Sequence, residues 1–302
     1  MRIDVVTVPY RYDHYLDGSG RGASVLIDGG LLDRLGDAGV TVGEVRESTL
    51  AESERADGST AVRIGRLGSH TAGHVAAGLQ HADAVAVISG DDTAMVGVMS
   101  GIQQVHGAGA KIGLVWFDAH GDFNTPDTSY SGILAGMPLA ILAGLAGPLW
   151  RGAAGLAAPI PTDRIVIAGV RMLDEREQSL LQSTDVRVIP ARDLPTGALF
   201  RQAVTRLQQE CDVICVHIDL DVLDPSLVPS SATPEPDGLS VADLTRLVTA
   251  VLATGKVGIV SFAGLNPGGG KRGETSVGTA ARVIVDVVTA WSAQEPNTDA
   301  DA

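Results

Sequence analysis

The stretch Val115-Trp116-Phe117-Asp118-Ala119-His120-Gly121-Asp122-Phe123-Asn124 joins an apolar run to the pattern Asp-x-His-x-Asp. If the strand continues through this triplet, Asp118, His120 and Asp122 point to one face, because side chains alternate along a strand. Two carboxylates and an imidazole on one side suit one divalent ion, or two ions that share a bridging carboxylate. The alternative for this segment alone is a strand end with solvated acids.

A second segment of the same kind covers residues 213–225, Val-Ile-Cys-Val-His-Ile-Asp-Leu-Asp-Val-Leu-Asp-Pro. Its alternation predicts that His217, Asp219 and Asp221 share one face. Clustered carboxylates without a cation repel one another and raise each other's pKa. Together the two segments therefore favour a metal site over two unrelated strand ends.

A third acidic pair follows the apolar run 85–88, in Ser89-Gly90-Asp91-Asp92-Thr93. One of these acids is expected to cap the helix that begins there, since aspartate is a favoured N-cap residue. Both need not cap, and beside the other two segments we expect Asp92 to be a metal ligand.

Length and composition indicate a soluble globular protein of 302 residues, 45% of them hydrophobic, without an apolar run long enough to span a membrane. The first residues look like a strand rather than a signal peptide, so a cytoplasmic location is expected. A net charge of -14 argues against nucleic acid and is compatible with a cationic substrate, although acidic surfaces also serve solubility. Cys211 and Cys215 are expected to be core residues rather than a disulfide.

Short apolar runs alternate along the chain with longer Ala/Leu-rich stretches, which predicts a parallel sheet sandwiched by helices. The expected strands are 2–8, 39–45, 84–88, 112–117, 164–170, 185–189, 213–220 and 257–262. The expected helices are 23–37, 70–80, 93–107, 131–146, 174–183, 197–210, 240–254 and 275–293. We expect a single domain over 1–294 with a surface loop at 144–163, and a disordered C-terminal tail over 295–302. Sites in such sheets form at the carboxyl ends of strands, where the acidic segments lie.

The three acidic segments, in this order and spacing, resemble the metal motifs of the arginase/agmatinase (ureohydrolase) family. The chain looks like a divergent member closer to arginase. The resemblance implies an α/β/α sandwich with a mainly parallel sheet, assembled as a trimer or hexamer. It also implies two manganese ions that share a bridging hydroxide, which attacks a cationic guanidino substrate and releases urea. The implied metal ligands are Asp92, Asp118, His120, Asp122, Asp219 and Asp221, and the implied catalytic residues are Asp122 and Glu177.

The same resemblance places substrate-binding residues at Asn124, Ser131, Asp174 and Thr233. In arginases the residues that match Asn124, Ser131 and Asp174 contact the α-carboxylate and α-amino groups, so an amino-acid substrate is expected rather than agmatine. Thr233 belongs to a segment that resembles the loop lining the guanidino pocket. Judged without the resemblance, Asn124 is a turn residue and Asp174 a helix cap.

Three positions depart from the family pattern. Asp92 stands where the family has a metal-binding histidine, Ala135 stands where arginases have a histidine that shuttles a proton, and Gly264 replaces an expected glutamate. The loss of a general acid typically slows a reaction by about 10²–10⁴-fold. Ile133 also replaces the asparagine of the arginase segment.

His217 lies two residues before Asp219, where relatives usually have a small residue. It is a candidate outer partner or substitute ligand of the metals, although a buried histidine bonded to backbone is the commoner outcome. Three functions therefore compete. They are a manganese hydrolase of arginine or a related guanidino amino acid, a family member with a shifted substrate such as N-hydroxyarginine, and a non-catalytic metal-binding homologue.

Overall fold

The computed structural model describes residues 1–294; the tail expected over 295–302 lies outside the described residues. Its centre is an eight-stranded sheet in the order β4-β1-β5-β10-β9-β6-β7-β8, with all neighbouring strands parallel. The strands are β1 (Arg2–Val8), β4 (Thr41–Glu47), β5 (Ala84–Ser89), β6 (Ile112–Phe117), β7 (Ile165–Val170), β8 (Arg187–Pro190), β9 (Val213–Asp219) and β10 (Val257–Ala263). A small hairpin of β2 (Tyr10–Arg11) and β3 (His14–Tyr15) follows β1.

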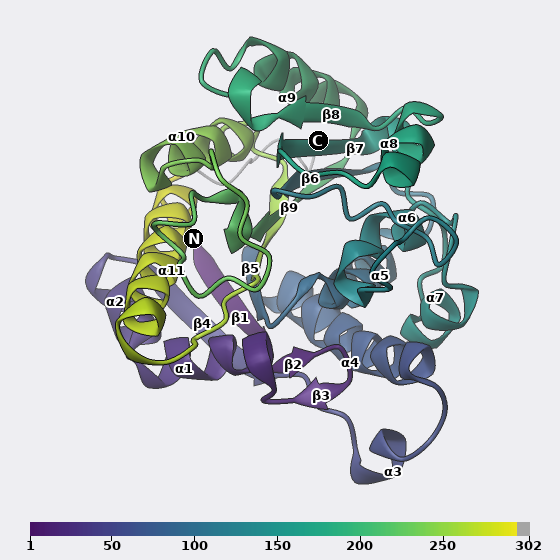
Figure 1. Cartoon of the computed structure of the whole chain (residues 1–302). Helices are drawn as coiled ribbons and strands as arrows, with labels where there is room; N and C mark the ends of the chain where they lie inside the picture. The colour runs from purple at the N-terminus through teal and green to yellow at the C-terminus, as the bar shows by residue number, and fades with distance from the viewer. Residues whose placement is uncertain (295–302) are drawn as a thin grey trace, which may run out of the picture.

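Helices cover both faces of the sheet (Figure 1). One face packs on α1 (Gly22–Asp28), α2 (Leu31–Asp37), α9 (Ala198–Glu210), α10 (Val241–Leu252) and α11 (Gly270–Ser292). The other face packs on α4 (Thr60–His81), α5 (Met95–His106), α6 (Pro138–Leu142), α7 (Pro148–Ala154) and α8 (Glu175–Gln182), while the short α3 (Glu52–Arg55) precedes α4. Every residue of β5, β6 and β9 is buried. A parallel sheet covered on both sides requires such apolar strands, and the predicted three-layer sandwich is confirmed.

The eight predicted strands are all present with ends within two residues of the expected ones, but several helices differ. The expected helix 23–37 is broken between α1 and α2, because Gly30 adopts a left-handed backbone with φ +79°. The expected helix 131–146 was wrong: it is mainly loop, with a short turn at 134–136 and the five-residue α6, because Gly132 and Gly144 also have positive φ. Helix α7 lies within the predicted loop 144–163, so that expectation was wrong in part.

Two further helices are longer than expected. Helix α4 begins ten residues before the predicted start at 70, and α11 begins five residues before 275. The added turns contain arginine, lysine and glycine among few apolar residues, which hides the apolar period from the sequence. Cys211 and Cys215 are free and buried, as expected. Among residues 1–294, no helix combines the length and apolar character needed to cross a membrane.

The sheet order explains how the three acidic segments meet. They follow β5, β6 and β9, and with β10 these strands are consecutive in the sheet. Neighbouring strands are about 4.8 Å apart, so the three carboxyl ends fall within about 15 Å of one another. Segments separated by up to 130 residues therefore converge on one edge.

The junction after β5 depends on Gly90, and its substitution should disturb the site. A Cβ at Gly90 would lie 2.1 Å from the Tyr10 carbonyl oxygen and 2.6 Å from the Gly20 Cα. We expect Gly90→Ala to lower the free energy of unfolding by about 1–3 kcal/mol through overpacking. Urea unfolding of the metal-free protein measures this value.

Gly73→Ala is the matched control, because Gly73 is exposed in α4 and a Cβ there meets no atom within 4 Å. It should raise the free energy of unfolding by about 0.5–1 kcal/mol, since alanine is the better helix former. Equal effects of the two substitutions would show that the close approach at Gly90 does not constrain the β5 end.

Candidate metal centre

A cavity of about 250 Å³ opens where β5, β6, β9 and β7 end. Its walls contain all eleven residues for which the sequence predicted a catalytic, metal or substrate role, namely Asp92, Asp118, His120, Asp122, Asn124, Ser131, Asp174, Glu177, Asp219, Asp221 and Thr233. His217 lies behind this wall and is fully buried. These residues belong to four separate segments of the chain, and the fold brings the segments together at this cavity.

The Asp118–Asp122 triplet reaches the cavity from a turn rather than from a strand. Strand β6 ends at Phe117, so the expectation that strand alternation orients the triplet was wrong. The Asp118 carboxylate accepts hydrogen bonds from the His120 backbone N–H at 2.7 Å and from Trp116 Nε1 at 3.0 Å. Asp122 has φ +47°, a left-handed conformation that turns the chain back toward the cavity.

The acidic segment at the end of β9 also reaches the cavity partly from a turn. Strand β9 ends at Asp219, and Asp221 belongs to a 3-10 turn, Leu220–Val222, so alternation holds only from His217 to Asp219. The Asp219 carboxylate accepts the Asp221 backbone N–H at 2.7 Å and thereby caps this turn. In the third segment Asp91 accepts the Thr93 backbone N–H and is the cap, which leaves Asp92 on the cavity wall.

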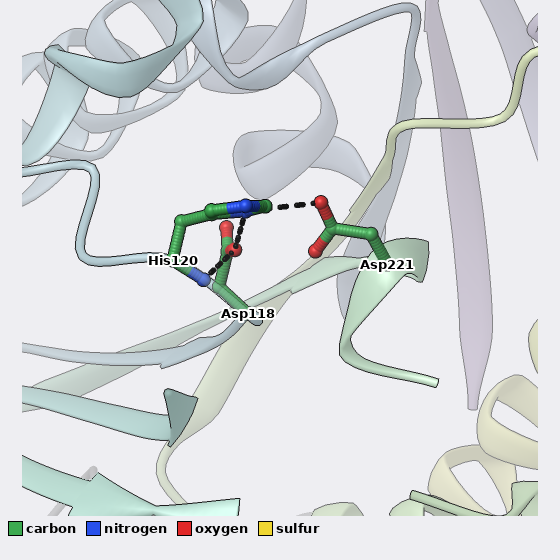
Figure 2. A group of neighbouring side chains, drawn as sticks. All are labelled: Asp118, His120 and Asp221. Carbon is green, nitrogen blue, oxygen red and sulfur yellow. Dashed lines mark hydrogen bonds and ion pairs between the residues drawn. The ribbon is translucent and has the colours of Figure 1, made fainter. Parts of the chain in front are cut away.

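Two overlapping groups of side chains are arranged to hold metal ions. Asp118, His120 and Asp221 form one, and Asp92, Asp118 and Asp122 form the other; within each, the possible ligand atoms lie within 4.8 Å of one another. His120 Nδ1 lies 3.1 Å from Asp221 Oδ2 and 3.3 Å from Asp118 Oδ1 (Figure 2). Asp118 belongs to both groups.

The acids of this cluster are electrostatically strained without a cation. Burial raises the pKa of Asp219 to about 8, with a further contribution from Asp221. Burial and repulsion from Asp219 and Asp118 raise the pKa of Asp92 well above its usual range, and burial with repulsion from Asp118 does the same for Asp122. A divalent cation removes both causes, since it replaces the lost solvation and neutralises the neighbouring charges.

His120 behaves as a stand-in cation in the metal-free protein. Burial lowers the pKa of His120, but hydrogen bonds to Asp118 and Asp221 outweigh burial and raise it to about 11. A metal ion at this position displaces that proton, because only a neutral imidazole can ligate.

The donor set fits a hard to borderline divalent ion. Carboxylate oxygens with a single imidazole suit manganese better than zinc, which favours nitrogen and sulfur. Asp122 Oδ2 is buried and has no hydrogen-bond partner within residues 1–294, so one ligand atom is left available. The residues present therefore fit the metal that the acidic motifs imply.

The residues predicted to bind substrate form a polar part of the same cavity wall. Asn124 Nδ2 donates to Asp174 Oδ2 at 3.2 Å, and Thr233 Oγ1 donates to Asp221 Oδ2 at 2.9 Å. Glu177 accepts the Phe123 backbone N–H at 2.9 Å, which ties α8 to the turn that carries Asp122. Ser131 is exposed at the edge of the same cavity.

Three residues at the site were not given roles from the sequence. The Arg171 guanidinium donates to the carbonyl oxygens of Asp221 and Glu235, at 2.8 and 3.1 Å, and so fixes two cavity loops. Glu235 Oε1 lies 3.9 Å from His120 Nε2. Trp116 donates to Asp118, as described above. The only sequence signal was position, because Arg171 and Trp116 lie at strand ends and Glu235 lies two residues after Thr233.

A larger cavity of about 810 Å³ lies near the β8 edge and is lined by side chains such as Gln178, Thr184, Arg187 and Arg206. It contains none of the clustered acids, so the smaller cavity is the site with the chemistry.

Together, the fold and the acid cluster define an α/β/α protein with a candidate metal site at the carboxyl edge of a parallel sheet. The model of the Arginase family matches residues 5–289, and the chain therefore belongs to the arginase family. As a member it is a hydrolase that acts on non-peptide C–N bonds in linear amidines.

Individual relatives agree with this membership. The chain is 27% identical to the arginase of Bacillus subtilis over 88% of this chain and 90% of that one. It is 37% identical to the N(omega)-hydroxy-L-arginine amidinohydrolase of Streptomyces lavendulae over 58% of each chain. The crystal structure of Entamoeba histolytica arginase in complex with L-ornithine shares the fold, with a TM-score of 0.82 at 23% identity over 95% of this chain and 98% of that one.

The strained acids predict how the stability of the metal-free protein depends on pH. Raised pKa values mean that the folded state binds more protons than the unfolded state between about pH 4 and pH 8, so stability should fall as pH rises through that window. The raised pKa of His120 acts in the same direction. Thermal melts at several pH values, with and without Mn²⁺, measure this pH dependence of stability. The ion should raise the melting temperature most near the alkaline end of the pH window.

Asp219→Asn is the matched variant, because it removes one titrating carboxyl group and keeps the size and shape of the side chain. Its metal-free stability should vary less with pH than that of the wild type. A wild-type melting temperature that climbs steadily from about pH 5 to about pH 8 without metal would contradict the strained cluster.

Proposed function

We propose that this chain is a manganese-dependent hydrolase that cleaves a guanidino C–N bond of arginine or a related guanidino amino acid and releases urea or a urea derivative. The observation that carries the proposal is the pair of overlapping ligand groups that share Asp118. We extend the proposal to two manganese ions, to a homo-oligomer, either trimer or hexamer, and to a cytoplasmic location.

The metal ligands in this proposal are those predicted from the sequence: Asp92, Asp118, His120, Asp122, Asp219 and Asp221. Bound divalent ions neutralise such carboxylates and lower the pKa of water enough for hydroxide to form near neutral pH. The acidic wall also attracts a planar guanidinium, because the wall is negatively charged and the guanidinium is positively charged.

Catalytic roles are proposed for Asp122 and Glu177. Asp122 Oδ2 is the buried oxygen without a partner in the described chain, so it is free to accept a proton or an ion. Burial raises the pKa of Glu177 to about 7, which is in the range that general acid–base catalysis requires. Glu177 also holds the Phe123 N–H, and through it the turn that carries Asp122.

The substrate head group is assigned to the polar wall. Asn124, Ser131 and Asp174 are proposed to contact an α-amino and α-carboxylate group, directly or through water. Thr233 is proposed to line the guanidino end, because its hydroxyl is held on Asp221 beside the metal groups.

The departures from the family pattern favour a second candidate, an N-hydroxyarginine or related amidino hydrolase. Ala135 lines the cavity where arginases carry a proton-shuttling histidine, and alanine has no proton to give. Gly264 has φ +81°, and a Cβ there would lie 2.4 Å from Asp219 Oδ1. A glutamate is therefore disfavoured at this position, and a substrate whose guanidino group is less basic than that of arginine would depend less on an anionic partner there.

The direct test loads the purified protein with Mn²⁺ and assays urea, hydroxyurea and the released amine from a panel of guanidino compounds. We expect turnover of at least one compound that carries an α-amino acid group, and none of the simple amine agmatine. Ornithine formed from arginine supports the first candidate, and hydroxyurea formed faster than urea supports the second. Bound manganese without turnover of any compound would refute the proposed activity.

A separate prediction concerns Ala135. If the missing acid limits the reaction, Ala135→His should raise kcat on arginine by about 10²-fold, within the usual contribution of a general acid. Ala135→Gln is the control, because it fills similar space without an acid–base group, and an equal gain in both variants would contradict a role in proton transfer.

A further inference from the structure

A row of buried side chains runs across three strands beneath the acid cluster. Trp116 on β6, His217 on β9 and Ser261 on β10 are register partners in the sheet. All three are fully buried, with 0% exposure. Residues in register on neighbouring parallel strands point to the same face, so this row forms a layer one step inside the strand ends.

Two members of the row reach the acids above them. Trp116 Nε1 donates to Asp118 Oδ2 at 3.0 Å, and His217 Nε2 lies 2.9 Å from Asp92 Oδ1. The two rings are stacked at a tilt, with centroids 3.9 Å apart. Each ring therefore restricts the other, and each nitrogen is directed at a different carboxylate.

The proton of His217 can be assigned from its surroundings. His217 Nδ1 has no hydrogen-bond partner within residues 1–294, and the same holds for the hydroxyl of its register partner Ser261. When a bound metal ion keeps Asp92 ionised, the carboxylate can only accept, so His217 Nε2 then carries the hydrogen.

We propose that Trp116 and His217 form a positioning pair that holds one oxygen of Asp118 and one of Asp92 and leaves the other oxygens for metal ions. Outer partners of this kind orient ligands, and their loss typically weakens metal binding about 10–100-fold. In this chain the imidazole of His217 is the outer partner of Asp92. This inference rests on the metal centre of the proposed function.

The pair should act unequally on the two ions. Asp118 belongs to both ligand groups, whereas Asp92 belongs to one. The loss of the Trp116 N–H should therefore weaken both binding events, and the loss of the His217 N–H should weaken one of them.

The test is titration of metal-free protein with Mn²⁺ alone by isothermal calorimetry, using Trp116→Phe and His217→Phe. Both variants keep an aromatic ring and remove the N–H donor. We expect His217→Phe to lower the affinity of one manganese about 10–100-fold and leave the other near its wild-type value. Trp116→Phe should weaken both. Circular dichroism and thermal melts establish that each variant is folded.

Two controls separate positioning from packing. His217→Gln keeps an N–H donor on a shorter side chain and should recover most of the lost affinity. Trp150→Phe removes a buried indole N–H that has no partner within residues 1–294, so manganese binding should not change. If His217→Phe does not fold, the comparison between the glutamine variant and His217→Leu carries the same test.

The outcomes distinguish this inference from the proposed function. A wild-type protein that binds no manganese overturns the metal centre, and the inference with it. A wild type that binds manganese, with folded Trp116→Phe and His217→Phe variants of unchanged affinity, overturns the positioning pair alone. Equal weakening by His217→Phe and His217→Gln would assign the effect to packing and also overturn it.

Discussion

Repulsion among buried carboxylates is the constraint on which the rest of this structure depends. Asp92, Asp118, Asp122, Asp219 and Asp221 are each no more than 6% exposed and share one cavity wall. Buried acids this close cannot all be ionised without a cation, and the raised pKa values express that conflict. Binding of a metal ion would resolve this conflict, so the same repulsion would favour the binding of a divalent cation.

The sheet supplies the rigidity that such a cluster needs. Strands β5, β9, β6 and β7 end at the cavity, each packed between two helical layers, and the acids lie at or just after the ends of three of them. The turns past the strand ends are held by local hydrogen bonds, such as the Asp219 cap on the Asp221 N–H and the Arg171 contacts to carbonyl oxygens. Rigid strands whose ends are fixed by hydrogen bonds can hold these mutually repelling carboxylates close together.

The departures from the family pattern are consistent with one another. The proton donor and the anionic partner at positions 135 and 264 are absent, while the metal-capable side chains and the polar wall remain. In the proposed reaction, bound ions and the remaining acids would therefore have to supply what the side chains at positions 135 and 264 do not. The positive φ of Gly264, +81°, is a backbone conformation that residues with a side chain rarely adopt, so the backbone at this position disfavours a glutamate.

The sequence by itself determined the sheet and the list of acids. Continuous apolar runs can only be covered strands, and acids directly after such runs must lie at the carboxyl edge. Helix limits were less predictable, because glycines with positive φ at Gly30 and Gly132 break patterns that look periodic. Only the tertiary structure decided that Asp118 and Asp221 reach the cavity from turns, and that Trp116 and His217 support the acids from beneath. Strand order and register determine those contacts. Neither can be predicted from the local sequence, because strand pairing joins residues that are far apart in the chain.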